Sequence, residues 1–288
     1  MPSLPHLKSG WMVVAGVLFS CMGVFVKLGA AYFSSAELVF YRSLFGLLAI
    51  ALIIKSQRLP VATPHWKAHL WRGLSGFAAL MLFFYAIGQL PLATAVTLNY
   101  TAPLFLAFLS VLILKERPHL PLILAILLGF AGVVLLLRPT LHQEQLAAGL
   151  MGLTSGFLAA IAYLNVKQLG QLGEPEWRVV FYFTLVCTIG GGIWMAPHTF
   201  HPLTPLNLLL LLGLGATATL AQLAMTRAYR EGRTLVVGSL AYSTVVFASL
   251  WGILLWHEVL SPASWLGIAL IALSGVLASR MAPRLPVV

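Results

Sequence analysis

Ten apolar stretches, each about as long as a bilayer is thick, follow one another through this chain with only short connections between them. The hydrocarbon core of a bilayer is about 30 Å thick, and an α-helix crosses it in about 20 residues. The sequence therefore predicts an all-α membrane protein with ten transmembrane helices. The predicted spans are residues 10–31, 35–54, 70–88, 91–114, 119–137, 148–166, 178–197, 206–229, 234–257 and 262–280.

Composition excludes a water-soluble fold for the same chain. Of the 288 residues, 60% are hydrophobic and 8% are charged, so polar side chains are too few to coat a soluble core. The formal net charge of +10 would suggest a nucleic-acid partner in a soluble protein. Here the lipid bilayer is the expected partner, and the positive charge is explained by membrane topology instead.

Lysine and arginine gather in the cytoplasmic connections of membrane proteins. The two termini and the even-numbered connections should lie on one side of the membrane. That side holds 14 of the 17 positive residues, Arg72 included. The other side holds only Lys27, Arg42 and Arg138. We therefore expect a multi-pass protein of the cytoplasmic (inner) membrane with both termini in the cytoplasm and the 197–205 connection outside.

An internal repeat divides the chain into two halves. FVKLG at 25–29 is matched by NVKQLG at 165–170, and the end of the fourth span, 99–116, is matched by 241–258. The offset stays close to 140 residues throughout. Each half has five predicted spans, an odd number, so the second half must enter the membrane in the opposite direction. The sequence thus predicts two inverted five-helix repeats, residues 1–140 and 141–288.

Several short patterns carry a family resemblance. They are FYRS at 40–43, the spaced pattern from Pro91 to Pro103, LKE at 114–116 with its counterpart ending in Glu258, and the glycine pattern at 129–133. Together with the five-plus-five plan, the chain resembles the EamA-type exporters of the drug/metabolite transporter superfamily. Within them it is similar to bacterial exporters of aromatic and other neutral amino acids. The resemblance implies a central cavity built by spans 1–4 and 6–9, with spans 5 and 10 supporting it.

Polar side chains deep in the spans are the candidates for substrate binding, because a polar group at mid-membrane depth usually faces protein or a cavity. Tyr100 and Tyr242 each lie eight residues into a span, about 12 Å deep, and therefore close to the midplane from opposite sides. The candidate substrate-binding residues are Asn99, Tyr100, Gln222, Tyr242, Tyr163, Tyr85, Ser243 and Trp251. Hydrogen bonding between helices is the competing interpretation of each.

Charged residues limit the chemistry that these spans can perform. The chain has no Asp, and its seven Glu residues stand at or near span ends, which leaves no mid-membrane carboxylate for a proton relay. Arg42 is the deepest clear charge, and it can pair with Glu37, extend its side chain toward the membrane surface or attract a substrate carboxylate. No constellation of nucleophile, base and acid is present, so we predict no enzyme activity, no metal site and no cofactor.

We therefore predict an exporter of amino acids, aromatic and other neutral ones foremost, that works by alternating access, with facilitated diffusion as the default mode. Its partners are the small-molecule substrate and the bilayer; the oligomeric state is left open. The alternatives are an exporter of another metabolite or drug, of nucleobase, nucleotide-sugar or multidrug type, and, from another class, a channel or a lipid-modifying membrane enzyme. A phosphate-bearing substrate would favour several deep Lys or Arg residues, and the sequence indicates only Arg42.

Overall fold

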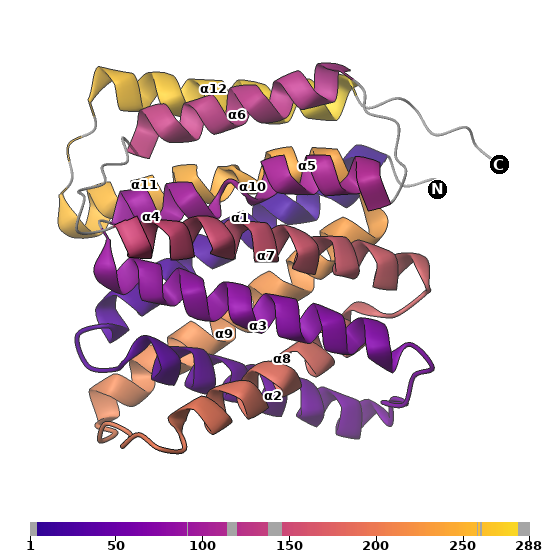
Figure 1. The fold of residues 1–288 in the computed structure, drawn as a ribbon, viewed down its shortest axis with the longest axis vertical. Helices are drawn as coiled ribbons and strands as arrows, with labels where there is room; N and C mark the ends of the chain where they lie inside the picture. Colours follow the sequence, from indigo (N-terminus) through magenta and orange to yellow (C-terminus); the bar gives the residue numbers. More distant parts are fainter. Residues whose placement is uncertain are drawn as a thin grey trace.

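The computed structural model describes residues 5–90, 92–113, 120–137, 146–257, 259 and 261–281, which form helices and their connections without a strand (Figure 1). The helices of the first half are α1 (Pro5–Gly29), α2 (Ser35–Gln57), α3 (Trp66–Gln89), α4 (Leu92–Asn99), α5 (Ala102–Ile113) and α6 (Leu120–Leu137). Those of the second half are α7 (Leu146–Gln171), α8 (Glu176–Met195), α9 (Pro205–Glu231), α10 (Thr234–Ala241), α11 (Ser243–Trp256) and α12 (Pro262–Met281).

The fold is helical as predicted, but the number of spans is not confirmed. Seven helical stretches are long and apolar enough to cross a membrane, with α10 and α11 counted as one. Three further stretches, at 95–109, 120–135 and 262–277, are apolar but shorter within the described residues. Ten spans therefore remain a prediction. Glu116 and Glu258, which contribute to the family resemblance, lie outside the described residues, as do Arg138 and the division at 140/141.

The helix starts follow from local capping chemistry. Ser34 and Glu37 form a capping box at the start of α2, in which each side chain accepts a hydrogen bond from the other residue's backbone N–H. Thr204 caps α9 by accepting a hydrogen bond from the Asn207 N–H, and Pro205 follows at the first helical position. These caps end the connections and begin the apolar helices at defined residues.

The fourth and ninth predicted spans are both interrupted near their centres. After α4, Thr101 donates a hydrogen bond from its Oγ1 to the Leu98 carbonyl at 2.6 Å, and Pro103 lacks the N–H that would continue the helical ladder. Gly156 of α7 lies against this interruption, where a Cβ atom would come within 2.8 Å of the Leu98 carbonyl oxygen. The second interruption, at Tyr242, has no proline and forms a tight turn in which Tyr242 N–H bonds to the Ser239 carbonyl.

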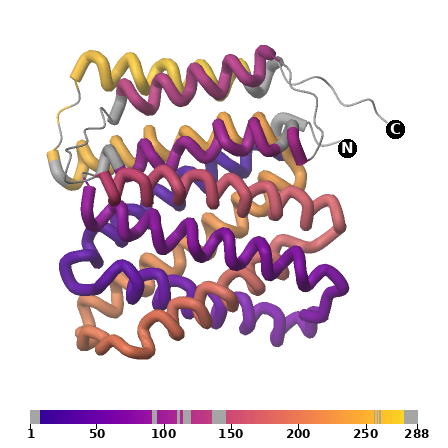
Figure 2. Tube along the Cα trace, viewed as in Figure 1, coloured from indigo at the N-terminus to yellow at the C-terminus, as the bar shows by residue number. Residues whose placement is uncertain are grey.

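The packing of the helices interleaves the two halves. Helices α2 and α8 lie together at one edge of the bundle, and α6 and α12 at the other, while α1 packs on α9 and α3 packs on α7 (Figure 2). Each of these pairs joins one helix from each half. The first helix of each half contacts the third helix of the other half: α1 contacts α9, and α7 contacts α3. This is the pairing expected of two repeats related by a two-fold axis.

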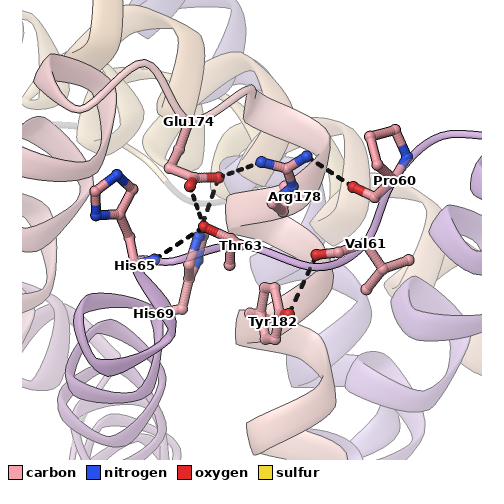
Figure 3. Close-up of polar contacts among 8 residues, drawn as sticks. All are labelled: Pro60, Val61, Thr63, His65, His69, Glu174, Arg178 and Tyr182. Atoms are coloured by element: carbon pink, nitrogen blue, oxygen red, sulfur yellow. Dashed lines mark hydrogen bonds and ion pairs between the residues drawn. The ribbon is translucent and has the colours of Figure 1, made fainter.

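Two buried carboxylates tie connections of the two halves together. Glu37 of α2 accepts a hydrogen bond from the His201 backbone N–H at 2.7 Å and lies 2.8 Å from His201 Nδ1. Glu174, between α7 and α8, accepts hydrogen bonds from Thr63 of the α2–α3 connection and from Arg178 Nη1 at 2.9 Å (Figure 3). The two carboxylates therefore play similar parts in fastening the α8–α9 and α2–α3 connections.

The Glu174 network extends further into the first half. His69 Nε2, completely buried, lies 3.3 Å from Glu174 Oε2, and Arg178 also donates to the Pro60 carbonyl at 2.7 Å. Burial alone would raise the pKa of the Glu174 carboxyl, but the hydrogen bonds from Thr63, Arg178 and His69 outweigh it and hold that pKa below its usual value. Glu174 is therefore ionised at neutral pH and keeps these partners together.

Candidate functional site

A cavity of about 470 Å³ lies between the two halves. Its walls come from α1, α2, α3 and α4 of the first half and from α7, α8, α9 and α11 of the second. No described residue of α6 or α12 lines it, in agreement with the supporting role that the family resemblance implies for spans 5 and 10. A volume of this size is typical of sites for small molecules.

Aromatic rings form much of the cavity wall. They are Phe19, Phe83, Phe84, Tyr100, Tyr163, Phe183 and Trp251. Two of them are held in place by neighbours: Tyr163 stacks on Tyr229 with ring centroids 5.3 Å apart, and Trp251 donates its indole N–H to Ser20 Oγ at 3.1 Å. Large rings of this kind provide apolar contact area and hydrogen-bonding edges at once.

Neutral polar groups stand between the rings. Asn99 Nδ2 donates to Ser155 Oγ at 3.0 Å, which orients the Asn99 amide at the interruption between α4 and α5. Gln222 of α9 accepts a hydrogen bond through its Oε1, and Thr244 and Ser249 come from α11. Carbonyl oxygens and hydroxyl groups can coordinate an ammonium group, and amide N–H groups can donate to a carboxylate.

Among the described residues, three cationic ones line the cavity, Lys27 of α1 and two arginines, and the arginines are the more deeply buried. Arg42 of α2 and Arg72 of α3 both line the cavity, with side chains 3% and 2% exposed. Arg72 Nη2 donates to Gln222 Oε1 at 3.2 Å. The guanidinium carbon of Arg72 lies 4.1 Å from the centroid of the Phe183 ring, and that of Arg42 lies 6.0 Å from it. One aromatic ring thus contacts both cations.

Neither arginine has a carboxylate partner in the described part of the chain. Glu37, a partner that the sequence suggested for Arg42, is occupied by Ser34 and His201 instead. None of the described residues that line the cavity is acidic. Both guanidinium groups therefore place positive charge in the cavity wall, and this charge would attract a negatively charged solute.

The sequence indicated Arg42 as the only deep Lys or Arg, but Arg72 also lines the cavity. Arg72 was assigned to the cytoplasmic connection because the third span was expected to begin at residue 70. The helix begins at Trp66 instead, which places Arg72 six residues, or about 9 Å, inside it. No alternation of charged and apolar residues marks Arg72 at the start of this helix; the sequence there reads WKAHLWR, with Lys67 and Arg72 each following a tryptophan.

The structure places five of the eight candidate binding residues in the cavity wall. These are Asn99, Tyr100, Tyr163, Gln222 and Trp251.

The other three candidates lie elsewhere. Tyr242 is fully buried and packs in the cluster that includes α6 and α12, against Gly129. Ser243 borders a separate hollow beside α12, and Tyr85 is 43% exposed on the outside of α3. Residue counts predict depth in the membrane, but depth does not determine which side of a helix faces the cavity. Phe183 and Arg72 are among the lining residues that sequence reasoning missed.

The comparisons with known proteins agree with this architecture. The EamA-like transporter family matches the chain twice, at residues 7–138 and 146–280. The pseudopaline exporter CntI of Pseudomonas aeruginosa (strain UCBPP-PA14) is 32% identical over 279 residues, which cover 96% of this chain and 98% of that protein. A riboflavin transporter of Vibrio cholerae serotype O1 is 27% identical over 269 residues, covering 92% and 90% of the two chains.

A solved crystal structure shares the fold. It is 19% identical in sequence, covers 98% of this chain and 100% of its own, and superposes with a TM-score of 0.83. The similarity to bacterial exporters of aromatic and neutral amino acids is not specifically supported, because the named relatives transport other small metabolites. With the family matched along nearly the whole length and a relative above 30% identity, this multi-pass membrane protein belongs to the EamA-like transporter family.

Proposed function

We propose that this chain exports small carboxylate-bearing metabolites, amino acids among them, across the cytoplasmic membrane by alternating access. The observation that carries the proposal is the central cavity between the two halves, with guanidinium groups in its wall and no described acidic residue lining it. A guanidinium binds a carboxylate through two parallel hydrogen bonds, which makes it a selective partner for that group.

The remaining wall supports an amino-acid-like substrate. Asn99, Gln222 and the ring of Tyr100 can hold an ammonium group, while the apolar rings accommodate a side chain. The similarity to a protein named as an exporter supports the outward direction of transport. The position of the cavity between two repeats supports alternating access, because transporters built from two such repeats expose a shared central site to each side in turn.

The test is counterflow in proteoliposomes that contain the purified chain and a panel of labelled solutes: phenylalanine, threonine, glutamate and glutarate. Saturable exchange of at least one carboxylate-bearing solute is expected. Tyr100→Ala should weaken its apparent affinity about 10- to 150-fold if the hydroxyl bonds a charged group of the substrate. If phenylalanine is transported, its apparent affinity should fall more than that of threonine, because only phenylalanine has a ring that can pack on the Tyr100 ring.

Tyr85→Ala is the matched control, since it removes the same side chain from the outer surface of α3. It should leave affinity and rate unchanged. Non-saturating flux of all solutes would indicate a channel instead. Equal behaviour of the Tyr100→Ala and Tyr85→Ala variants, both folded normally, would place the binding site elsewhere.

A further inference from the structure

We propose that Arg42 and Arg72 together form a binding site for two anionic groups on one small solute, so that the preferred substrate is a dicarboxylate or an acidic amino-acid derivative. This inference rests on the proposed function and narrows its substrate class. It differs from the neutral amino acids that the sequence resemblance suggests.

The first support is the state of the two cations. Both side chains are at least nine-tenths buried and line the cavity. Among the described residues, the Nε and Nη1 atoms of each have no hydrogen-bond partner. A buried charge without a partner is strongly unfavourable, and a charge kept for packing alone would be paired within the protein. Two unpaired guanidiniums in one cavity therefore call for two negative groups from outside the chain.

The second support is that the position of Arg72 is prepared by its neighbours. Gln222 Oε1 accepts from its Nη2 at 3.2 Å, and the Phe183 ring lies under its guanidinium plane at 4.1 Å. Gly76, one turn further along α3, leaves space for the same group, because a Cβ atom at Gly76 would collide with Arg72 Nη1. These contacts fix the orientation of the guanidinium, whose Nε and Nη1 atoms are buried without a protein acceptor.

The third support is the shared ring. The guanidinium carbons of Arg42 and Arg72 lie 6.0 and 4.1 Å from the centroid of the same Phe183 ring, so both groups belong to one part of the cavity wall, and we expect one solute to reach both. A neutral amino acid has a single carboxylate, so it would leave one guanidinium unpaired and bring an ammonium group near it. A solute with two carboxylates satisfies both cations, and the low dielectric of a buried site strengthens each ion pair.

The test measures binding to the purified full-length chain in neutral detergent by isothermal titration calorimetry. The probes are glutarate, with two carboxylates, and butyrate, with one; inorganic phosphate and phosphatidylglycerol are included because phosphate oxygens also bind guanidinium groups. Glutarate is expected to bind at least about tenfold more tightly than butyrate. Equal affinity for glutarate and butyrate would overturn the proposal. Binding of phosphate or phosphatidylglycerol by a chain that does not bind glutarate would also overturn it.

The variants Arg42→Gln and Arg72→Gln should each reduce glutarate affinity by about tenfold or more and bring it close to that of butyrate. Arg227→Gln is the matched control, because Arg227 is an exposed arginine paired with Glu231. It should leave glutarate binding unchanged. Gly76→Ala keeps both charges but displaces the Arg72 guanidinium, and should also weaken glutarate more than butyrate.

Stability without any probe separates a binding role from a structural one. If the arginines await a solute, Arg72→Gln should unfold at the same temperature as the wild type or a higher one, because an unpaired buried charge has been removed. Destabilisation or misfolding of that variant would show that Arg72 supports the fold, and would overturn the proposal.

Counterflow distinguishes failure of this inference from failure of the proposed function. Glutarate binding that requires both arginines, without transport of any solute, would refute only the transport function. Transport of monocarboxylates that is unaffected by Arg42→Gln and Arg72→Gln would refute only the two-anion site.

Discussion

Replacing Glu174 by Gln perturbs the network that joins the α2–α3 connection to the α7–α8 connection (Figure 3). The carboxylate is 3% exposed, accepts hydrogen bonds from Thr63 and Arg178, and faces His69 at 3.3 Å. Glutamine has the same shape but presents an NH₂ group in place of one acceptor oxygen. At least one hydrogen bond to a charged group is lost, so the free energy of unfolding should fall by about 1.5–3 kcal/mol.

Two features of the structure limit this magnitude. Arg178 retains its hydrogen bond to the Pro60 carbonyl, and the amide oxygen of glutamine still accepts from one donor. The matched control is Glu176→Gln, two residues away. Glu176 pairs with Arg230 at 2.7 Å, but both side chains are partly exposed, so its loss should change stability by only about 0–1 kcal/mol.

We expect Glu174 to contribute to acid sensitivity of the wild type for the same reason. The pKa of Glu174 is lower in the folded chain than its value of about 4.3 in an unfolded one. Its stabilising contribution is therefore complete above the unfolded pKa and is lost as the pH falls through the folded pKa. Glu174→Gln should consequently lose less stability on acidification than the wild type does.

Unfolding in mixed micelles with increasing dodecyl sulfate, monitored by tryptophan fluorescence at neutral pH and at about pH 4, measures both effects. The reasoning is refuted if Glu174→Gln and Glu176→Gln are equally stable at neutral pH. It is also refuted if the Glu174→Gln variant keeps the full acid sensitivity of the wild type.

Two further predictions concern topology and coupling. With single cysteines in a Cys21→Ala/Cys187→Ala background, an impermeant thiol reagent applied to intact cells should label position 202 but not position 57, because the positive charges favour a cytoplasmic location for the latter; the opposite pattern would invert the topology. Transport should follow the gradient of the solute alone, since no Glu stands in the middle of a predicted span. Accumulation above equilibrium in liposomes, driven by an imposed proton gradient and lost on replacing one Glu, would contradict this.

The helices could be predicted from the sequence because the bilayer imposes length and apolarity on each span. The interruption between α4 and α5 is followed by Pro103, a residue type that marks helix breaks in a sequence. The matching interruption at Tyr242 has no such signal; the Tyr242 ring there packs against Gly129 of α6. A helix break that a residue such as proline causes can therefore be predicted from local sequence. A break that accompanies tertiary packing cannot.

The candidate site was predictable in part for a related reason. Residue counts predict similar depths for Tyr100 and Tyr242, yet of the two only Tyr100 lines the cavity, because the rotation of each helix is set by its neighbours. Arg72 was missed through a helix start displaced by four residues, from 70 to 66. This error of about one helical turn assigned Arg72 to a connection, although the residue lines the cavity.

The central claim is that solute passes through the cavity between the two halves, and substrate protection of a cysteine in its wall tests this most directly. Ser249 of α11 lines the cavity and is 9% exposed, and Ser249→Cys changes a single atom. In a background lacking Cys21 and Cys187, we expect a thiol reagent to modify this cysteine and block counterflow, and the transported solute to slow the modification. A cysteine at the exposed Ser56 should react at the same rate with and without solute. Modification of Ser249→Cys at an unchanged rate in the presence of saturating solute would contradict the account.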